Sequence, residues 1–299
     1  MENQQNKSAE VTLEMLRQDI DNIDNKIIAL LNQRMKVIDR VGELKKNNHE
    51  NFFIRAAREA DMIKELIKKS DGNFPHSAIV GIWRKIIAAA NMHEQKIKIA
   101  LHNPKNIADY FYLLREYYFD AVPIYTHDSA TNIVSDLEKN EAQIGVFALP
   151  KNNNEDFDKS DITENWWIGL ANNKSGIKIF AKIPFLEVDN KLGNNDNKIN
   201  LVALAIKAAE RSKQDNSLFY LEVKKEISRS QVSEIFAKQN LTITILKSVK
   251  LPQIDDIIFY LIEVAGFFED DSAAIKELKQ SKIRPYIKVL GSYAVPIKI

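Results

Sequence analysis

The feature that most constrains this chain is a heptad repeat of apolar residues near its N-terminus. Apolar side chains recur at alternating steps of three and four, at Leu13, Leu16, Ile20, Ile23, Ile27, Leu30, Val37, Val41 and Leu44. Residues three and four apart share one face of an α-helix, and such a seam packs against another helix. The spacing predicts a helix of about 30 residues, longer than a globular helix usually is, with a seam that requires a partner.

One position in this seam is charged. The step of four from Leu30 lands on Arg34, and a charge in a packed seam is costly unless it is paired. Lys45 lies about 20° around the helix from Arg34 and ~16 Å along it, so the two cations could converge on one dianion. Arg17 is ~25 Å from Arg34, so either the helix bends or Arg17 serves a partner subunit's site. The alternative for each residue is an ordinary solvated base.

Two further helices complete an all-α region. The pattern predicts one helix from about Ile54 to Lys69 and another from Pro75 to about Gln95, with a turn at 71–73 between them. Polar groups on facing helices can build a site in the core of a helical bundle. The candidates here are Arg58, Glu59 and Glu94.

These residues resemble the all-helical chorismate mutase family. The resemblance covers about Thr12 to Gln95 and rests on Leu16-Arg17, Asp24, Lys26, Arg34, Val41-Gly42, Lys45, Arg58-Glu59 and Glu94-Gln95. It implies an intertwined homodimer of three-helix protomers that converts chorismate to prephenate by a Claisen rearrangement, with no cofactor and no metal. Catalysis then consists of holding a dianion in its reactive conformer and stabilising negative charge on its ether oxygen.

The resemblance also implies a role for each residue. Arg17 would come from the partner subunit, Arg34 and Arg58 would bind substrate carboxylates, Lys45 would donate to the ether oxygen, and Glu59 would hold the ring hydroxyl.

Two positions depart from the family's pattern. Glu94 stands where the family often has Gln, so it would have to be protonated to face a developing oxyanion. A register error of one residue would make Gln95 the ligand instead. Arg55 stands where an Asp is often found, and is either an additional cation at the site mouth or a solvated residue.

From Lys96 onward, short apolar strands alternate with helical segments, which is typical of an α/β layer. Trp166 to Ile168 and Ile177 to Phe180 are expected to be strands, and residues 152–154 and 193–197 to be loops. After about residue 213 the order βαββαβ is expected. The predicted organisation is a multidomain chain with a mutase domain at 1–96, a degenerate α/β dehydratase-like region at 97–212, and an α+β ACT-like domain at 213–299.

In bifunctional relatives the mutase is followed by a prephenate dehydratase domain and an ACT domain. Residues 136–146 and 288–293 resemble parts of these domains. The Thr-Arg-Phe motif that carries dehydration in the family is absent, and the nearest region, 177–184, reads Ile-Lys-Ile-Phe-Ala-Lys-Ile-Pro. We therefore expect no dehydratase activity.

The ACT-like region lacks its usual ligand signatures. Lys225-Glu226-Ile227 replaces a Gly-Ala-Leu turn, and residues 247–250 replace a Glu-Ser-Arg-Pro stretch. Glycine allows the backbone to approach a ligand closely, so its loss argues against phenylalanine binding in the usual mode. The region is either a scaffold that supports oligomerisation or a sensor of a different ligand.

Composition excludes several other classes of function. The chain has no cysteine, and its nine glycines form no nucleotide-binding or nucleophile-elbow motif. A formal net charge of +1 gives no basic field for nucleic acid or membrane. The start resembles no signal peptide, so a cytoplasmic location is expected. Two alternatives stay open: an inactive dimerisation protein that binds another shikimate-pathway enzyme, and a working bifunctional mutase/dehydratase.

Overall fold

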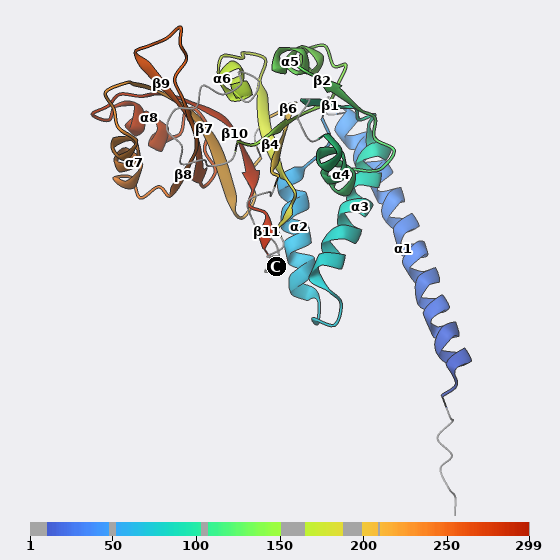
Figure 1. Ribbon diagram of the computed structural model, residues 1–299. Coiled ribbons are helices and arrows are strands. Elements are labelled where there is room, and N and C mark those ends of the chain that lie inside the picture. Colours follow the sequence, from blue (N-terminus) through green and yellow to red (C-terminus); the bar gives the residue numbers. More distant parts are fainter. Residues whose placement is uncertain are drawn as a thin grey trace, which may run out of the picture. The chain divides into compact units, whose positions relative to one another are not determined.

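The computed structural model describes residues 11–47, 52–102, 107–150, 165–187, 199–208 and 210–298. The chain forms two compact units, residues 1–53 and residues 54–299. Figure 1 colours the chain from blue at the N-terminus to red at the C-terminus.

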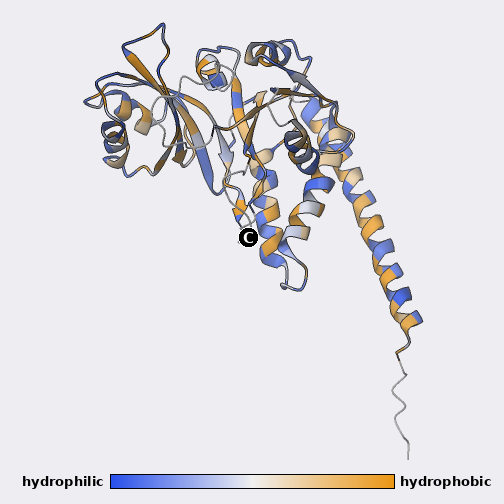
Figure 2. Cartoon of the chain, in the orientation of Figure 1, coloured by the Kyte–Doolittle hydropathy of each residue, from blue (hydrophilic) through white to orange (hydrophobic). Residues whose placement is uncertain are grey.

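The first unit contains the predicted long helix, α1, at Leu13–Asn47. Its 35 residues extend three residues beyond the predicted end at Leu44. Eight of the nine apolar seam residues on α1 are 48–64% exposed and Val41 is half-buried, and Figure 2 shows orange segments alternating with blue ones along this helix. We call this set the α1 stripe: Leu13, Leu16, Ile20, Ile23, Ile27, Leu30, Val37 and Leu44. Within the described residues, the stripe is an exposed apolar surface.

The second unit begins with the two other predicted helices, α2 at Ala56–Lys69 and α3 at His76–Glu94. The turn between them is closed by the Asp71 carboxylate, which accepts a hydrogen bond of 3.0 Å from the Asn73 backbone N–H. Helix α2 packs on α3, and Ile63 on α2 is fully buried. Both predicted helices are therefore present within two residues of their expected ends.

A nine-stranded sheet forms the centre of the second unit. Its strands, in spatial order, are β2 (Ile124–His127), β1 (Ile99–His102), β3 (Ile144–Ala148), β6 (Leu201–Ile206), β4 (Ile177–Ile183), β10 (Tyr286–Ala294), β7 (Asp215–Lys224), β9 (Ile257–Ala265) and β8 (Ile243–Val249). The β1 pairings with β2 and β3 are parallel, as is the contact of β4 with β10, and the other pairings are antiparallel. A separate pair joins β5 (Leu186–Glu187) to β11 (Ile297–Lys298).

Five more helices cover this sheet or its ends (Figure 1). They are α4 (Ile107–Tyr117), α5 (Ala130–Glu138), α6 (Trp166–Ala171), α7 (Arg229–Ala237) and α8 (Ala273–Lys279). Alternation along β7 separates two cores, because successive strand residues face opposite sides of a sheet. Leu218 and Tyr220 belong to the core beneath α5 and α6, whereas Phe219 and Leu221 belong to the core beneath α7 and α8.

The βαββαβ order predicted for the C-terminal region is present as β7-α7-β8-β9-α8-β10. Strand β10 joins this module to β4 at one residue pair, Gly291 with Ile179. The sheet is therefore continuous across residue 212, where we predict a domain boundary.

Two expectations about strands need correction. Residues 166–168, predicted as a strand, lie in helix α6, where Trp166, Trp167, Leu170 and Ala171 are buried at helical spacing. The reason is that this segment covers the sheet, with the Trp166 indole N–H donating to the Ala148 carbonyl at 2.8 Å. Strand β6 was not predicted, although its first five residues are fully buried.

The loops expected at 152–154 and 193–197 lie outside the described residues. Among the helices that are described, none has the length and apolar character to cross a membrane.

Candidate functional site

Three of the predicted site residues lie on α1 in the first unit. Arg17 is exposed, with its Nη1 atom 3.9 Å from the Glu14 carboxylate. Arg34 and Lys45 are half-buried on the same unbroken helix. The Lys45 ammonium donates to the Phe53 carbonyl at 3.2 Å and lies 5.0 Å from the centre of the Phe53 ring.

The other predicted residues lie on α2 and α3 in the second unit. Arg58 is exposed on the first turn of α2, whereas its neighbour Glu59 is 7% exposed. Glu94 is the last residue of α3, Gln95 is its C-cap, and both are half-buried.

Glu59 is the centre of a buried polar cluster. Its Oε2 atom accepts a hydrogen bond of 3.1 Å from Arg84 Nη1, and its Oε1 atom accepts one of 3.0 Å from Asn91 Nδ2. Arg84 and Asn91 are themselves 5% and 8% exposed. We call Glu59, Arg84 and Asn91 the Glu59 cluster. Removing one partner of such a buried pair costs about 3–5 kcal/mol, because it leaves a charge uncompensated.

An aromatic ring from α4 completes this environment. The Arg84 guanidinium lies 3.9 Å from the centre of the Tyr117 ring. Desolvation lowers the pKa of Arg84, but its interactions with Tyr117 and Glu59 outweigh this and raise it overall. Burial raises the pKa of Tyr117, and that of Tyr118 beside it. Arg84 is thus a permanent cation and both tyrosines stay neutral.

A second polar group anchors the start of α2 to the segment that follows β6. Arg55 Nη1 lies 2.5 Å from the Glu210 carboxylate, so this residue is ion-paired. Lys207 donates to the Ile54 carbonyl at 3.0 Å and lies 3.4 Å from Glu210. Burial lowers the pKa of Lys207, partly offset by Glu210. Residues from the end of β6 and beyond therefore fix the backbone just before Glu59.

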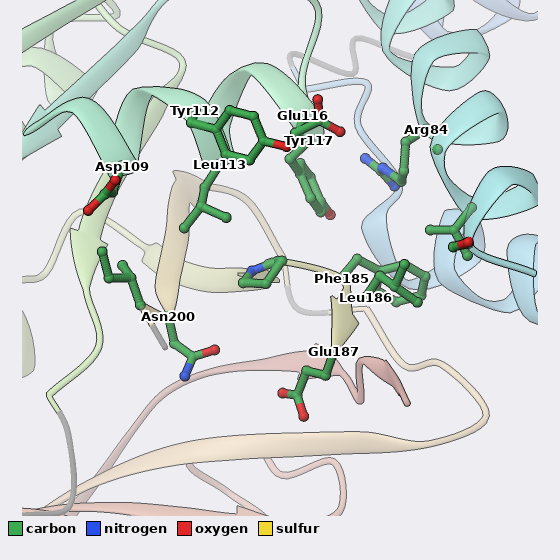
Figure 3. A pocket seen from close by; sticks show the side chains of 15 residues that line it. Arg84, Asp109, Tyr112, Leu113, Glu116, Tyr117, Phe185, Leu186, Glu187 and Asn200 are labelled. Carbon is green, nitrogen blue, oxygen red and sulfur yellow. The ribbon is translucent and has the colours of Figure 1, made fainter. Parts of the chain in front are cut away.

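A pocket of about 760 Å³ lies on the side of Arg84 that faces α4 (Figure 3). Its wall includes Arg84, Tyr117, Phe185 and Glu187, and its other lining residues come from α3, α4 and the segments 184–186 and 199–200. None of the predicted site residues lines it. Within the described parts of the chain, no group of three or more His, Asp or Glu residues is arranged to hold a metal ion.

Sequence reasoning missed Arg84, Asn91, Tyr117 and Lys207. A signal for the first two exists: Val80, Arg84, Ile87 and Asn91 follow each other at steps of four and three, which places two polar residues on a buried helix face. Tyr117 and Lys207 come from later in the chain, and no local pattern links them to Glu59.

Comparison with known proteins finds a family that is similar to the helical segment. The family described as chorismate mutase type II matches residues 16–95. A bifunctional chorismate mutase/prephenate dehydratase from Aquifex aeolicus (strain VF5) is 37% identical over 97 residues. That match covers 31% of this chain and 26% of the relative, so the chain matches about a quarter of the relative's length.

Two solved structures resemble a larger part of the chain at low identity. The prephenate dehydratase from Streptococcus mutans has a TM-score of 0.46 at 15% identity, covering 68% of this chain and all of that protein. GqqA, described as a novel type of quorum quenching acylase, has a TM-score of 0.44 at 12% identity, covering 66% of this chain and 95% of its own.

Proposed function

We propose that this protein is a chorismate mutase, on the premise that its residues 16–95 belong to the chorismate mutase type II family. The observation that carries the proposal is that this one segment contains every residue proposed for the site: Arg17, Arg34, Lys45, Arg58, Glu59 and Glu94. The reaction is the Claisen rearrangement of chorismate to prephenate, in the biosynthesis of aromatic amino acids.

The proposed mechanism is electrostatic and conformational. Arg34 and Arg58 bind the two carboxylates of chorismate, which holds the substrate in its reactive conformer. Lys45 donates to the ether oxygen, on which negative charge develops as the carbon–oxygen bond breaks. Glu59 accepts a hydrogen bond from the ring hydroxyl. No proton is transferred and no covalent intermediate forms, so the residues need only shape and charge.

The proposed assembly is a homodimer in which α1 of each protomer packs on its partner and Arg17 enters the partner's site. The exposed α1 stripe supports this, because an apolar surface of this length is rarely left in water. Arg17 supports it too, since its guanidinium is exposed and its contact with Glu14 is as long as 3.9 Å.

The decisive assay follows loss of chorismate by the purified protein. We expect turnover by the wild type and a loss of about 10- to 100-fold in kcat/KM in Arg34→Ala, because the variant loses a charge-assisted contact with a substrate carboxylate. Arg40→Ala is the matched control, because Arg40 is an exposed cation on the same helix, outside the proposed site. Folded wild-type protein without turnover would instead indicate an inactive dimerisation protein that binds another shikimate-pathway enzyme.

Glu94 is proposed to face the ether oxygen as a protonated acid. Activity should then fall as pH rises from about 5 to about 9, because the ionised carboxylate repels the developing oxyanion. Glu94→Gln should flatten this profile. A flat wild-type profile, together with loss of activity in Gln95→Leu and none in Glu94→Gln, would make Gln95 the ligand instead.

We propose that the chain lacks dehydratase activity. The sequence has no Thr-Arg-Phe motif, so no residue is assigned to protonate the leaving hydroxyl of prephenate. Incubation of the purified protein with prephenate should give no phenylpyruvate. Formation of phenylpyruvate would establish the bifunctional alternative.

The βαββαβ module is proposed to be an ACT-like scaffold that supports oligomerisation. Its turn at 225–227 lacks the glycine of the usual ligand site, which supports this assignment. Phenylalanine, tyrosine and tryptophan should therefore change neither the melting temperature nor the mutase rate. A response to any of them would identify the module as a sensor.

A further inference from the structure

We infer that Arg84 and Asn91 are positioning residues, which hold Glu59 as the ionised acceptor for the ring hydroxyl of the substrate. The inference rests on the proposed function and adds two residues that sequence reasoning did not select. It also adds a third, Tyr117, from outside the segment that matches the family.

Each carboxylate oxygen of Glu59 accepts one hydrogen bond within the Glu59 cluster. Arg84 donates to Oε2 at 3.1 Å and Asn91 donates to Oε1 at 3.0 Å. An ionised carboxylate can accept about four hydrogen bonds, so each oxygen keeps capacity for one more. Two donors on opposite oxygens fix the rotation of the carboxylate plane, and the two remaining acceptor directions are thereby fixed as well.

Arg84 also places a positive charge beside this acceptor. Glu59 is 7% exposed, and a buried carboxylate without a cation beside it is strongly disfavoured. The charged groups that face it are Arg84 on α3 and Lys207 at the end of β6, and the neutral ones are Tyr117 and Tyr118. Arg84 is the cation in direct contact. A hydrogen bond to an ionised acceptor is roughly twice as strong as one to a neutral acceptor.

Tyr117 in turn holds Arg84. The ring lies 3.9 Å from the guanidinium carbon and is packed edge-on against Tyr118, with 4.9 Å between the ring centres. Stacking on an aromatic face restricts the guanidinium plane, which sets the direction of the N–H bonds toward Glu59. Helix α4 thus supports a group on α2 through a residue on α3.

This arrangement predicts a specific kinetic signature. The ring hydroxyl takes no part in bond breaking, so its hydrogen bond has the same strength in the bound substrate and in the transition state. Loss of such uniform binding raises KM and leaves kcat nearly unchanged. Weakening the acceptor by removal of Arg84 or Asn91 should therefore raise KM for chorismate about tenfold.

The test compares four full-length variants with the wild type: Arg84→Met, Arg84→Lys, Asn91→Leu and Tyr117→Leu. Compared with Arg84→Met, Arg84→Lys should recover part of the affinity, because it keeps the positive charge but lacks the planar set of N–H donors of the guanidinium. Lys85→Met is the control, since Lys85 is the adjacent cation on α3 but lies 3.3 Å from Asp120 rather than near Glu59. Melting temperatures show which variants are folded. If Arg84→Met does not fold, Asn91→Leu decides, because it removes a neutral donor only.

A chorismate analogue that lacks the ring hydroxyl provides the second measurement. Its inhibition constant should be the same for the wild type and the folded variants, whereas KM for chorismate rises. Unchanged KM in folded Arg84→Met and Asn91→Leu would overturn the inference, as would an equal loss of affinity for chorismate and the analogue. A folded wild type that does not rearrange chorismate would instead overturn the proposed function itself, and the inference with it.

Discussion

Gly291 is the residue on which the continuity of the sheet depends. Its φ of +148° is one that residues with a side chain rarely adopt. A Cβ atom added there would lie 2.8 Å from the Ile179 Cα and closer still to its backbone N and O. The obstacle is backbone and cannot rotate away.

Replacing this glycine should therefore be severe. We expect Gly291→Ala to lower the free energy of unfolding by about 3 kcal/mol or more, through steric overlap at the contact of β4 with β10. Gly81→Ala is the matched control, because Gly81 is inside α3 with nothing within 4 Å of the added Cβ. The control should gain about 0.5–1 kcal/mol. Urea unfolding measures both, and equal stability of the two variants would refute the assignment.

Charged residues at apolar seam positions can be selected from the sequence alone. Their buried hydrogen-bond partners cannot. Glu59 could be selected from its neighbour Arg58 and its place on a helix. Its hydrogen-bond donors could not be selected in this way. The sequence alone does not show whether Arg84 faces solvent or the core, because this depends on how α4 packs. Arg55 shows the same limit: it pairs with Glu210, a residue 155 positions away.

Among the elements, α1 is the one whose sequence pattern and structure agree most fully. A strict repeat of three and four over more than 30 residues leaves little choice of secondary structure. Helix α6 shows where pattern fails. Its six residues are too few to reveal a period, and two adjacent tryptophans favour a strand by propensity alone. The segment is helical because this places its apolar residues against the sheet.

The α1 stripe makes a prediction about oligomeric state. Ile27 belongs to the stripe and Ile28 does not, although they are 48% and 59% exposed. A lysine in a packed helical seam is costly, so Ile27→Lys should shift the protein toward monomer, whereas Ile28→Lys should shift it less. Light scattering during gel filtration gives the mass of each. A wild type that is already monomeric at micromolar concentration would contradict the proposed dimer.

At the scale of the molecule, one sheet joins the parts on either side of residue 212 within the compact unit of residues 54–299. The order of elements after residue 213 was predictable, because each strand and helix has its own apolar period. The joining of that module to β4 was not, since it depends on one glycine and a pairing that spans 112 residues. Stability should follow the sheet rather than the predicted boundary at 212.

Two probes on opposite sides of that boundary should unfold together. The tryptophans Trp83, Trp166 and Trp167 report on the part before residue 212. The chain has no cysteine, so Lys279→Cys on α8 gives a single site for a fluorophore in the βαββαβ module. We expect the same urea midpoint from both signals. An earlier transition of the label would mean that the module unfolds by itself.

The contact of β4 with β10 has one more consequence, which concerns solubility. Strand β4 is largely apolar and buried on both faces, so it is unsuited to be the last strand of a sheet. The C-terminal module moves the free edge from β4 to β8, where Lys247 interrupts the apolar run and Lys250 follows its end. Charged residues on an outer strand discourage pairing with other chains. The module therefore covers the edge of β4, and we expect it to lower the tendency of the chain to aggregate.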